Sequence, residues 1–364
     1  MRLFPGRSVR DWHESVLPHS LSIHRRRDSY NAPSSQRLVV RSSRVLFVRT
    51  DRLGETLLNL PVLHALREVL PHGHVILMAH PALCELFVGH PDFNEVIGEP
   101  ALQGAWWQRA WHLVTLWRSQ HVDTIVISNP KKEYHVAAWL TGIPTRVGYD
   151  RKWGWLLTHR VTDRKALGER HEVEYNLELL HALGISVPRS PSFQLSVSEE
   201  EKRRILQLLE ELKVRETDHL VAIHPWTSNP NKQWPSQRFR ALIDRLAQMP
   251  GVKPVVIGGK EERAREAEVL EGQKDHVVNV VGRLSLTALA ALLQRVRLLV
   301  SNDSGPMHLA AAVSTPVIAL FGTAERGSHP RRWGPWGSGH TVIHKPLLDI
   351  SVEEVLGAVQ RYLS

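Results

Sequence analysis

Two patterns of apolar residues alternate along the chain from residue 44 onward. Short unbroken apolar runs, such as RVLFV at 44–48 and RLLVSND at 297–303, predict strands that are buried on both faces. Between such runs, apolar side chains recur at helical spacing. In residues 55–70 the pattern predicts a single amphipathic helix, whose apolar face is formed by Leu57, Leu60, Leu63, Leu66 and Leu70.

Strands that alternate with helices predict an α/β protein with parallel sheets covered on both faces. The alternation occurs in two sets, separated near 187–204 by the segment VPRSPSFQLSVSEEEKRR, which is rich in proline and serine and then in charge. We therefore predict two Rossmann-like domains, a last helix, and a basic N-terminal arm that we expect to be poorly ordered or peripheral. The expected bounds are 41–195 and 196–345 for the domains, 346–364 for the helix and 1–40 for the arm.

The composition is that of a globular protein that interacts with an acidic partner. The 364 residues are 42% hydrophobic and 23% charged, with a formal net charge of +9. This charge suits nucleic acid, anionic lipid or a phosphorylated substrate. A single cysteine, Cys84, excludes an internal disulfide and a cysteine-based metal cluster, and no run approaches the roughly 18 apolar residues of a membrane span.

Ligands of parallel sheets bind beyond the carboxyl ends of strands, so the loops that follow strands are candidate sites. In RLLVSNDSGPMHLAAA (297–312), the residues Asp303, Ser304 and Gly305 form a tight turn before a helix. Free N–H groups at such a helix start suit a diphosphate, which Ser304 and His308 could also contact. A capped structural helix with His308 in the core explains the same residues, and both readings stay open at this point.

Two more loops of the second half carry candidate residues. In VAIHPWTSNPNKQWP (221–235), Thr227 and Lys232 follow a strand, and a lysine there could neutralise a leaving phosphate. In VVIGGKEE (255–262), paired glycines allow a ligand to come close, and Glu261 or its neighbour could accept from ribose or adenine. A surface lysine and an ordinary turn are the structural alternatives.

The first half carries an acid in the stretch RTDRLGETLLNLP (49–61). Glu55 falls directly after a glycine, at the start of a helix that follows a buried strand. A carboxylate there either favours the helix dipole by about 0.3–1 kcal/mol or acts as a general base toward an acceptor hydroxyl. Basic residues that suit an anionic acceptor follow two later strands of this half, unless they form only a solvated face: Lys131, Lys132, Arg146, Arg151 and Lys152.

Taken together and in order, these stretches resemble glycosyltransferase family 9, the ADP-heptose:lipopolysaccharide heptosyltransferases. The resemblance is carried by RTDRLGETLLNLPVLHALR, HEVEYNLELLHALG, KQWP, IGGKEE and SNDSGPMHLAAAVSTPVIALFG, with RRWGP after them. It implies a GT-B fold whose second domain binds a nucleotide-sugar, typically ADP-heptose. The first domain would bind the Kdo or heptose acceptor of inner-core lipopolysaccharide, and the last helix would return toward that domain.

The resemblance also implies an inverting transfer without a metal or other cofactor, in the cytoplasm and with peripheral contact at the inner membrane. It makes Glu55 the base, at a position where aspartate is commoner, and gives Lys232 a catalytic role at the donor phosphates. The residues implied to bind the donor are Thr227, Lys232, Glu261, Asp303, Ser304, Gly305 and His308. Those that we expect to bind the acceptor are Arg52, Lys131, Lys132 and Arg151.

Other functions remain open at this level. A family-9-like transferase could use another nucleotide-sugar or acceptor, and a nucleotide-sugar 2-epimerase could share the GT-B fold. A non-catalytic nucleotide or nucleic-acid binder is a further alternative. We expect no nucleic-acid partner, because the strand–turn–helix sites account for the basic loops.

Overall fold

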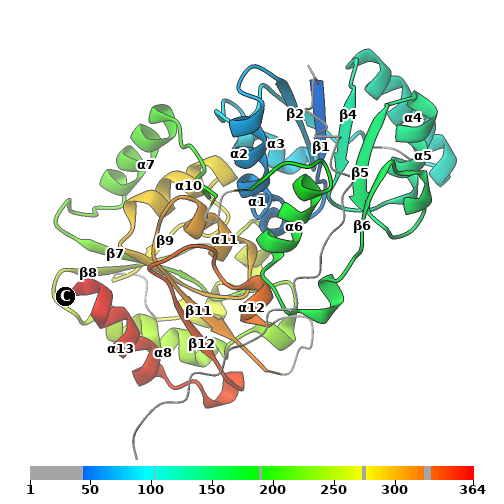
Figure 1. Ribbon diagram of the computed structural model, residues 1–364. Coiled ribbons are helices and arrows are strands. Elements are labelled where there is room, and N and C mark those ends of the chain that lie inside the picture. Colours follow the sequence, from blue (N-terminus) through cyan, green and yellow to red (C-terminus); the bar gives the residue numbers. More distant parts are fainter. Residues whose placement is uncertain (1–43, 102, 188–190, 273–275, 324–328) are drawn as a thin grey trace, which may run out of the picture. The chain divides into compact units, whose positions relative to one another are not determined.

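The computed structural model describes residues 44–101, 103–187, 191–272, 276–323 and 329–364 (Figure 1). All of them fall within one unit, residues 38–364. The arm predicted for residues 1–40 lies outside the described residues. The unit contains two parallel six-stranded sheets flanked by helices, so the predicted α/β class with two Rossmann-like sheets is confirmed.

The first sheet has the strand order β3-β2-β1-β4-β5-β6, and all neighbouring strands pair in parallel. Its strands are β1 (Arg44–Val48), β2 (His74–Ala79), β3 (Glu95–Gly98), β4 (Thr124–Ile127), β5 (Thr145–Tyr149) and β6 (His159–Val161). The helices of this half are α1 (Leu53–Leu57), α2 (Leu60–Val69), α3 (Cys84–Phe87), α4 (Trp106–Ser119), α5 (Lys132–Thr141) and α6 (Glu172–His181). Three 3₁₀ turns join them, η1 (Pro81–Leu83), η2 (Gly154–Leu156) and η3 (Lys165–Leu167).

The second sheet has the order β12-β11-β10-β7-β8-β9. Its strands are β7 (His219–His224), β8 (Val252–Val256), β9 (Val278–Asn279), β10 (Leu298–Asn302), β11 (Val317–Phe321) and β12 (Thr341–His344). Its helices are α7 (Glu199–Glu211), α8 (Ser236–Ala247), α9 (Ala267–Leu270), α10 (Leu286–Arg295), α11 (Gly305–Ala312), α12 (Pro330–Trp333) and α13 (Val352–Leu363). The 3₁₀ turns are η4 (Pro230–Lys232), η5 (Glu261–Arg265) and η6 (Leu347–Asp349).

Both sheets therefore follow the same winding, because the second order read from β9 to β12 repeats the pattern 3-2-1-4-5-6 of the first. In such a sheet the strand order reverses beside the first strand, between β1 and β4 in one half and between β7 and β10 in the other. Loops that leave the carboxyl ends of these strand pairs form a crevice suited to a ligand. Every candidate motif after β1, β4, β7 or β10 thus lies at one of two switch points.

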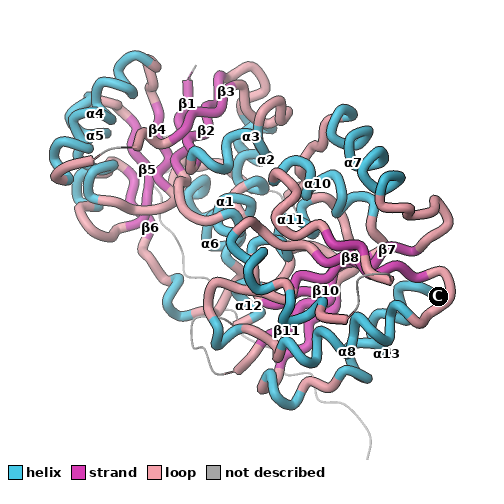
Figure 2. Tube along the Cα trace, turned by 180° about the vertical axis from the view of Figure 1, so that it is seen from behind, coloured by secondary structure: helices cyan, strands magenta, loops and turns pink. Residues whose placement is uncertain are grey.

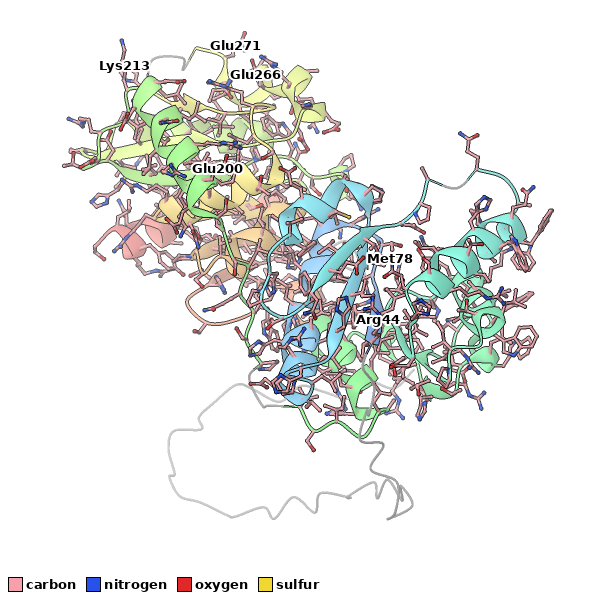
Figure 3. The ribbon with its side chains drawn as sticks, turned by 90° about the horizontal axis from the view of Figure 1, so that it is seen from above. Arg44, Met78, Glu200, Lys213, Glu266 and Glu271 are labelled. Atoms are coloured by element: carbon pink, nitrogen blue, oxygen red, sulfur yellow. The ribbon has the colours of Figure 1, made fainter. Side chains whose placement is uncertain are left out.

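The apolar pattern of the sequence explains why each sheet lies between two layers of helices. The strands are apolar on both faces, whereas most helices are apolar mainly on the face toward the sheet. All four residues of 45–48 in β1 are fully buried, as expected for a strand between two helical layers. Met78 in β2 is equally buried, whereas Glu200 of α7 and Lys213 point outward at the edge of the second half (Figure 3). Ser198 caps α7 as expected, since its Oγ accepts a hydrogen bond of 3.2 Å from the N–H of Glu201.

The single helix expected over 55–70 is wrong in one respect, because the chain forms α1 and α2 with a break at Leu58 and Asn59. Pro61 lies in the first turn of α2. In a continuous helix its ring would clash with the carbonyl of Leu57, and it has no N–H to donate. The break limits α1 to five residues and leaves Glu55 in its first turn.

Direct contacts join the two halves. Helices α1, α6, α11 and α12 lie together between the sheets (Figures 1 and 2). Leu53 of α1 packs against Gly305 of α11, and the N–H of Leu195 donates to the carbonyl oxygen of Ala312 over 2.8 Å. One apolar cluster includes residues from both sheets. The loops of the two switch points are thus held against each other by packed side chains.

The C-terminal helix differs from its expectation. Its main contacts are with α8 and β11 of the second half, rather than with the first half. Val355 and Val359 are fully buried there, within the apolar cluster that also contains Leu242 and Ile243 of α8. The apolar face of the helix at 352–363 therefore packs on the second sheet and its helix α8, and belongs to the second domain.

Candidate functional site

The turn between β10 and α11 has the geometry of an anion site. Ser304 is the N-cap of α11, but its side chain caps no N–H group of the helix. Its Oγ lies 2.9 Å from Oγ of Ser301 and 3.1 Å from Nδ1 of His224, both on neighbouring strands. The N–H groups of the first turn of α11 are consequently left without a side-chain cap, as they are where a phosphate binds a helix start.

Lys232 is brought to this turn by the pairing of β7 with β10. Its Nζ lies 2.9 Å from Oδ2 of Asp303, and both side chains are only partly exposed. The hydroxyl of Thr227 donates to the backbone carbonyl oxygen of Asp303 over 3.4 Å. Two motifs separated by about 70 residues in sequence therefore converge, as predicted for neighbouring strand ends. Their position beside the helix start concentrates donors and positive charge there.

His308 is a neutral imidazole at the first turn of α11. Its side chain is buried, and burial lowers its pKa to about 4. In the described part of the chain, its Nδ1 has no hydrogen-bond partner. The ring packs on Gly54, where an added Cβ would lie only 2.6 Å from Cδ2 of His308. Only glycine fits at this crossing of α1 and α11.

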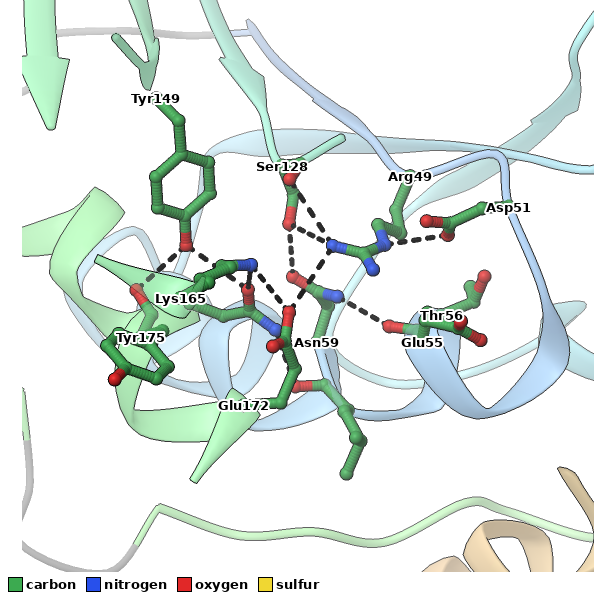
Figure 4. A network of polar contacts seen from close by, with 12 residues as sticks. Arg49, Asp51, Glu55, Thr56, Asn59, Ser128, Tyr149, Lys165, Glu172 and Tyr175 are labelled. Atoms are coloured by element: carbon green, nitrogen blue, oxygen red, sulfur yellow. Dashed lines mark hydrogen bonds and ion pairs between the residues drawn. The ribbon is translucent and has the colours of Figure 1, made fainter. Parts of the chain in front are cut away.

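Glu55 follows Gly54 directly and is a half-buried carboxylate. Burial raises its pKa, and the nearby Asp51 raises it further, against the opposing charges of Arg49 and Arg52. Among the described residues, no other side chain forms a hydrogen bond with its carboxylate, while Asn59 donates to its backbone carbonyl over 2.7 Å (Figure 4). A hydrogen bond from the backbone of Glu55 also lowers this pKa, but the net direction is upward. A raised pKa and a carboxylate that no other side chain engages are properties of a general base.

A buried polar network lies beside Glu55 (Figure 4) and was not anticipated from the sequence. Arg332 joins it to the second half through Glu172. Glu172, the first residue of α6, is almost completely buried. Its carboxylate lies 2.5 Å from Nζ of Lys165, 2.9 Å from the guanidinium of Arg332 and 3.9 Å from that of Arg49. Burial alone would raise the pKa of Glu172, but the three cations hold it below its usual value. One carboxylate thus organises cations from three distant segments.

The remaining contacts extend this network toward the opening stretch. Arg49 donates to Oδ1 of Asp51 over 2.7 Å and to the carbonyl oxygen and hydroxyl of Ser128 after β4. Ser128 in turn donates to Oδ1 of Asn59 over 2.8 Å. Asp51 and Arg49 are therefore fixed in the loop that ends at Glu55. The first switch point is rigid because its polar groups bond to one another.

A basic pocket of about 310 Å³ adjoins Glu172. Its charged lining consists of Lys165, His329, Arg331 and Arg332, with 166–168 completing the wall. Lys165 and Arg332 contact Glu172, but in the described residues Arg331 has no ion-pair partner. Such a pocket suits an anionic group. The motif RRWGP carries part of the family resemblance, but no local pattern indicates that it meets a loop near residue 165.

Most of the residues expected to bind an acceptor contact other side chains of the first half. Lys131 bonds to Glu99 over 2.9 Å, and Arg151 pairs with Asp163 over 3.0 Å. Lys132 lies over the ring of Trp106, 4.8 Å from its centroid, and Arg52 is exposed on the loop before α1. The arginine at 146 bonds to backbone carbonyl oxygens of its own half. Most of these cations already have partners, unlike Arg331.

Glu261 is exposed at the start of η5, after the paired glycines. A Cβ added at Gly259 would lie 2.9 Å from its carboxylate and 2.8 Å from that of Glu262. Glu262 accepts a hydrogen bond from the N–H of Gly259, which leaves Glu261 as the acid more open to a ligand. Arg265, the last residue of η5, donates to Oε1 of Gln233 over 3.1 Å, so this turn is joined to the residue that follows Lys232.

The described residues contain no group of three or more His, Cys, Asp or Glu side chains arranged to hold a metal ion. Cys84 is a free, partly buried thiol of α3, and burial raises its pKa. Within the described ranges, no helix has the length and hydropathy needed to cross a bilayer.

Two Rossmann-like sheets with switch-point loops held together at α1 and α11 define a GT-B type transferase architecture. The family model described as glycosyltransferase family 9 (heptosyltransferase) matches residues 124–351, which is more than half of the chain. The chain therefore belongs to glycosyltransferase family 9 and is a glycosyltransferase.

Similar proteins agree with this assignment. Lipopolysaccharide heptosyltransferase 3 of Escherichia coli K12 is 26% identical over 293 residues, covering 78% of this chain and 82% of the relative. Lipopolysaccharide heptosyltransferase 2 of Salmonella typhimurium is 25% identical over 355 residues, covering 88% and 99%.

Solved structures are similar in fold. The glycosyl transferase family 9 crystal structure from Veillonella parvula has a TM-score of 0.80 at 24% identity, covering 88% of this chain and 97% of that one. E. coli ADP-heptose lps heptosyltransferase II has a TM-score of 0.74 at 23% identity, covering 88% and 98%. At these identities the likeness supports the GT-B fold itself.

Proposed function

We propose that this glycosyltransferase moves a heptose from ADP-heptose to an inner-core lipopolysaccharide acceptor, with inversion at the anomeric carbon. The family description and the names of its relatives support a heptose donor and a lipopolysaccharide acceptor. The observation that carries the mechanism is the contact between Gly54 and His308. It brings the carboxylate of Glu55 beside the helix start that suits a diphosphate.

In the proposed reaction, an acceptor hydroxyl loses its proton to the carboxylate of Glu55 as its oxygen attacks the anomeric carbon. The new bond forms on the face opposite the leaving ADP, so the configuration inverts. The bond between the anomeric carbon and the phosphate oxygen breaks, and its electron pair leaves with ADP. Burial favours Glu55 as the base, because a raised pKa makes the carboxylate better at taking a proton.

Residues of the second half would stabilise the negative charge that develops on the leaving ADP. Lys232 is oriented by Asp303, and the uncapped N–H groups of α11 point toward the same space. Fixed donors and a lysine at a leaving diphosphate stabilise its charge as it forms. We propose that they do so without a metal ion, and addition of EDTA to the purified enzyme tests this part by leaving turnover unchanged.

The basic pocket supports an anionic acceptor. Arg331 is exposed and has no ion-pair partner in the described residues. It lies at the wall of a pocket that is also lined by Lys165 and Arg332, the two cations that contact Glu172 most closely. A carboxylate or phosphate on the acceptor would form charge-assisted hydrogen bonds there. We propose this pocket as the acceptor's anion site, in place of a cluster formed by Lys131, Lys132 and Arg151.

The deciding experiment uses Glu55→Gln, which keeps the shape of the side chain and removes the base. Turnover should fall by about 10²–10⁴-fold, while ADP still raises the melting temperature by mass action. The matched control is Glu68→Gln, an exposed acid of α2. Full turnover of Glu55→Gln with intact folding would remove Glu55 as the base.

The products separate this proposal from its alternatives. Transfer should require both ADP-heptose and acceptor, and the anomeric configuration of the product, read by NMR coupling, should be opposite to that of the donor. A thermal-shift comparison of ADP, UDP, GDP and CMP identifies the nucleotide. Conversion of a nucleotide-sugar without any acceptor would instead identify an epimerase.

A further inference from the structure

Tryptophan is concentrated in one part of the first half. Residues 105–161 contain seven of the twelve tryptophans of the chain. Only Trp117 among these seven is fully buried, where it packs near Tyr134. The others, together called the tryptophan face, are Trp106, Trp107, Trp111, Trp139, Trp153 and Trp155.

The tryptophan face is exposed to an unusual degree. Trp107 and Trp111 are each 59% exposed, Trp139 is 53% exposed and Trp155 is 66% exposed. Every exposed tryptophan among the described residues lies on this face. Single exposed apolar side chains need no explanation, but a group of large aromatic ones marks an interaction surface.

Packing holds these side chains in place. Helices α4 and α5 lie side by side (Figures 1 and 2), with α4 turning its buried residues inward and Trp107 and Trp111 outward, one turn apart. The rings of Trp106 and Trp153 are 5.2 Å apart, and those of Trp153 and Trp155 are 6.2 Å apart. Trp106, Trp153 and Trp155 thus hold one another in place, while Trp107 and Trp111 are presented by the same helix as Trp106.

The surroundings of the tryptophan face are basic. Residues 105–161 contain eight lysines and arginines against three acids, a net charge of +5. Glu99 and Asp163, outside this range, pair with Lys131 and Arg151, which leaves a net charge of +3. Of the three acids, Glu133 pairs with Arg109 over 3.3 Å. Arg118, Lys152 and Arg160 are exposed. This combination of positive charge and indole rings is what an anionic bilayer surface attracts.

The tryptophan face also borders the acceptor half. The starts of α4 and α5 and the turn η2 all follow carboxyl ends of strands in the first sheet. The loop carrying Glu55 leaves the same edge, from β1. Anything bound to the first turns of these helices therefore lies on the edge of the sheet where the acceptor arrives.

We propose that the tryptophan face docks on the surface of a bilayer rich in anionic lipid and holds the enzyme where a membrane-borne acceptor reaches Glu55. The proposal rests on the proposed function only in taking the acceptor to be a glycolipid. Indole rings bury their apolar part at the headgroup level and keep the N–H in a polar layer. A second copy of the chain is the poorer partner, because two faces of net positive charge would repel each other.

The test measures co-sedimentation of the full chain with vesicles of phosphatidylcholine alone or mixed with an equal part of phosphatidylglycerol. Wild type should bind the anionic vesicles, and the binding should weaken as salt is raised, since salt screens exposed charges. The variant Trp107→Ser/Trp111→Ser should bind them at least about tenfold more weakly, because two large apolar surfaces are lost. The matched control, Leu206→Ser/Leu348→Ser, removes exposed apolar side chains elsewhere and should bind like wild type.

Three results would overturn the proposal: wild type that does not bind anionic vesicles, a double tryptophan variant that binds them as wild type does, or a wild type that is oligomeric in solution and becomes monomeric in this variant. Turnover on a water-soluble, delipidated acceptor should be unchanged in the variant. That measurement distinguishes the two proposals. Vesicle binding without any transfer of sugar would contradict the proposed function but would still support the docking surface.

Discussion

Replacing Gly54 with alanine would place a methyl group 2.6 Å from Cδ2 of His308. Ordinary contacts of this kind are at least 3.4 Å, so the ring and α1 must separate by about 0.8 Å. His308 is buried and cannot move into solvent. Overpacking of this kind costs about 1–3 kcal/mol, and a displacement of about 1 Å at a reacting group can lower turnover about 10²-fold.

The assay compares melting temperature and turnover of Gly54→Ala with those of Gly357→Ala. Gly357 lies in α13, where an added Cβ meets nothing within 4 Å. The control should gain about 0.5–1 kcal/mol from helix propensity, whereas Gly54→Ala should melt several degrees lower than wild type. Adding His308→Ala removes the ring, so the alanine at 54 should no longer destabilise the protein in that background.

Two outcomes would refute this reasoning about the crossing of α1 and α11. One is a Gly54→Ala protein that is as stable and as active as wild type. The other is a cost of the alanine that persists unchanged when His308 has been removed, because the clash would then lie elsewhere.

Three further changes test the network, the base and the pocket. Glu172→Ala should cost about 3–5 kcal/mol, since it leaves buried cations such as Arg332 uncompensated. Because the folded protein lowers the pKa of Glu172, this stability is present at neutral pH and is lost as the pH falls below the ordinary value of 4.5, so the difference in melting temperature from wild type should shrink there. A pH profile of kcat/KM should show an acidic limb above pH 4.5 that Glu55→Gln removes. Arg331→Gln should raise the acceptor KM about tenfold at constant kcat, while Arg361→Gln on α13 should not.

Each of these predictions has a result that contradicts it. A Glu172→Ala protein that melts with wild type would show that the cations do not depend on this carboxylate. A profile without an acidic limb would assign the proton to another group. An unchanged acceptor KM in Arg331→Gln would remove the pocket from acceptor binding.

The sequence predicted the parallel sheets because their strands are continuous apolar runs. It missed β6 and β12, the outer strands of the two sheets, because their sequences HRV and TVIH are short, contain few apolar residues and are partly exposed. It joined α1 and α2 because apolar spacing continues across the break, whereas the backbone constraint at Pro61 ended the helix.

The donor side of the candidate site was predictable because its residues follow neighbouring strands of one sheet. Lys232 and Asp303 meet for this reason. Glu172 was not predictable, since Arg49 and Arg332 lie 123 and 160 residues away from it and no local pattern records such a meeting. The partners of the cations expected at the acceptor were likewise not predictable, because the sequence does not show that Lys131 is bound to Glu99.

The repeated winding of the two sheets has an evolutionary consequence. Each half carries its own switch point. On the proposed function, loops after β4 and β5 can therefore diverge and alter acceptor choice while the loops after β7 and β10 keep one donor. A family built in this way can diversify one specificity at a time. The two halves are not independent at the contact between Gly54 and His308, because a larger side chain at position 54 would clash with the ring of His308.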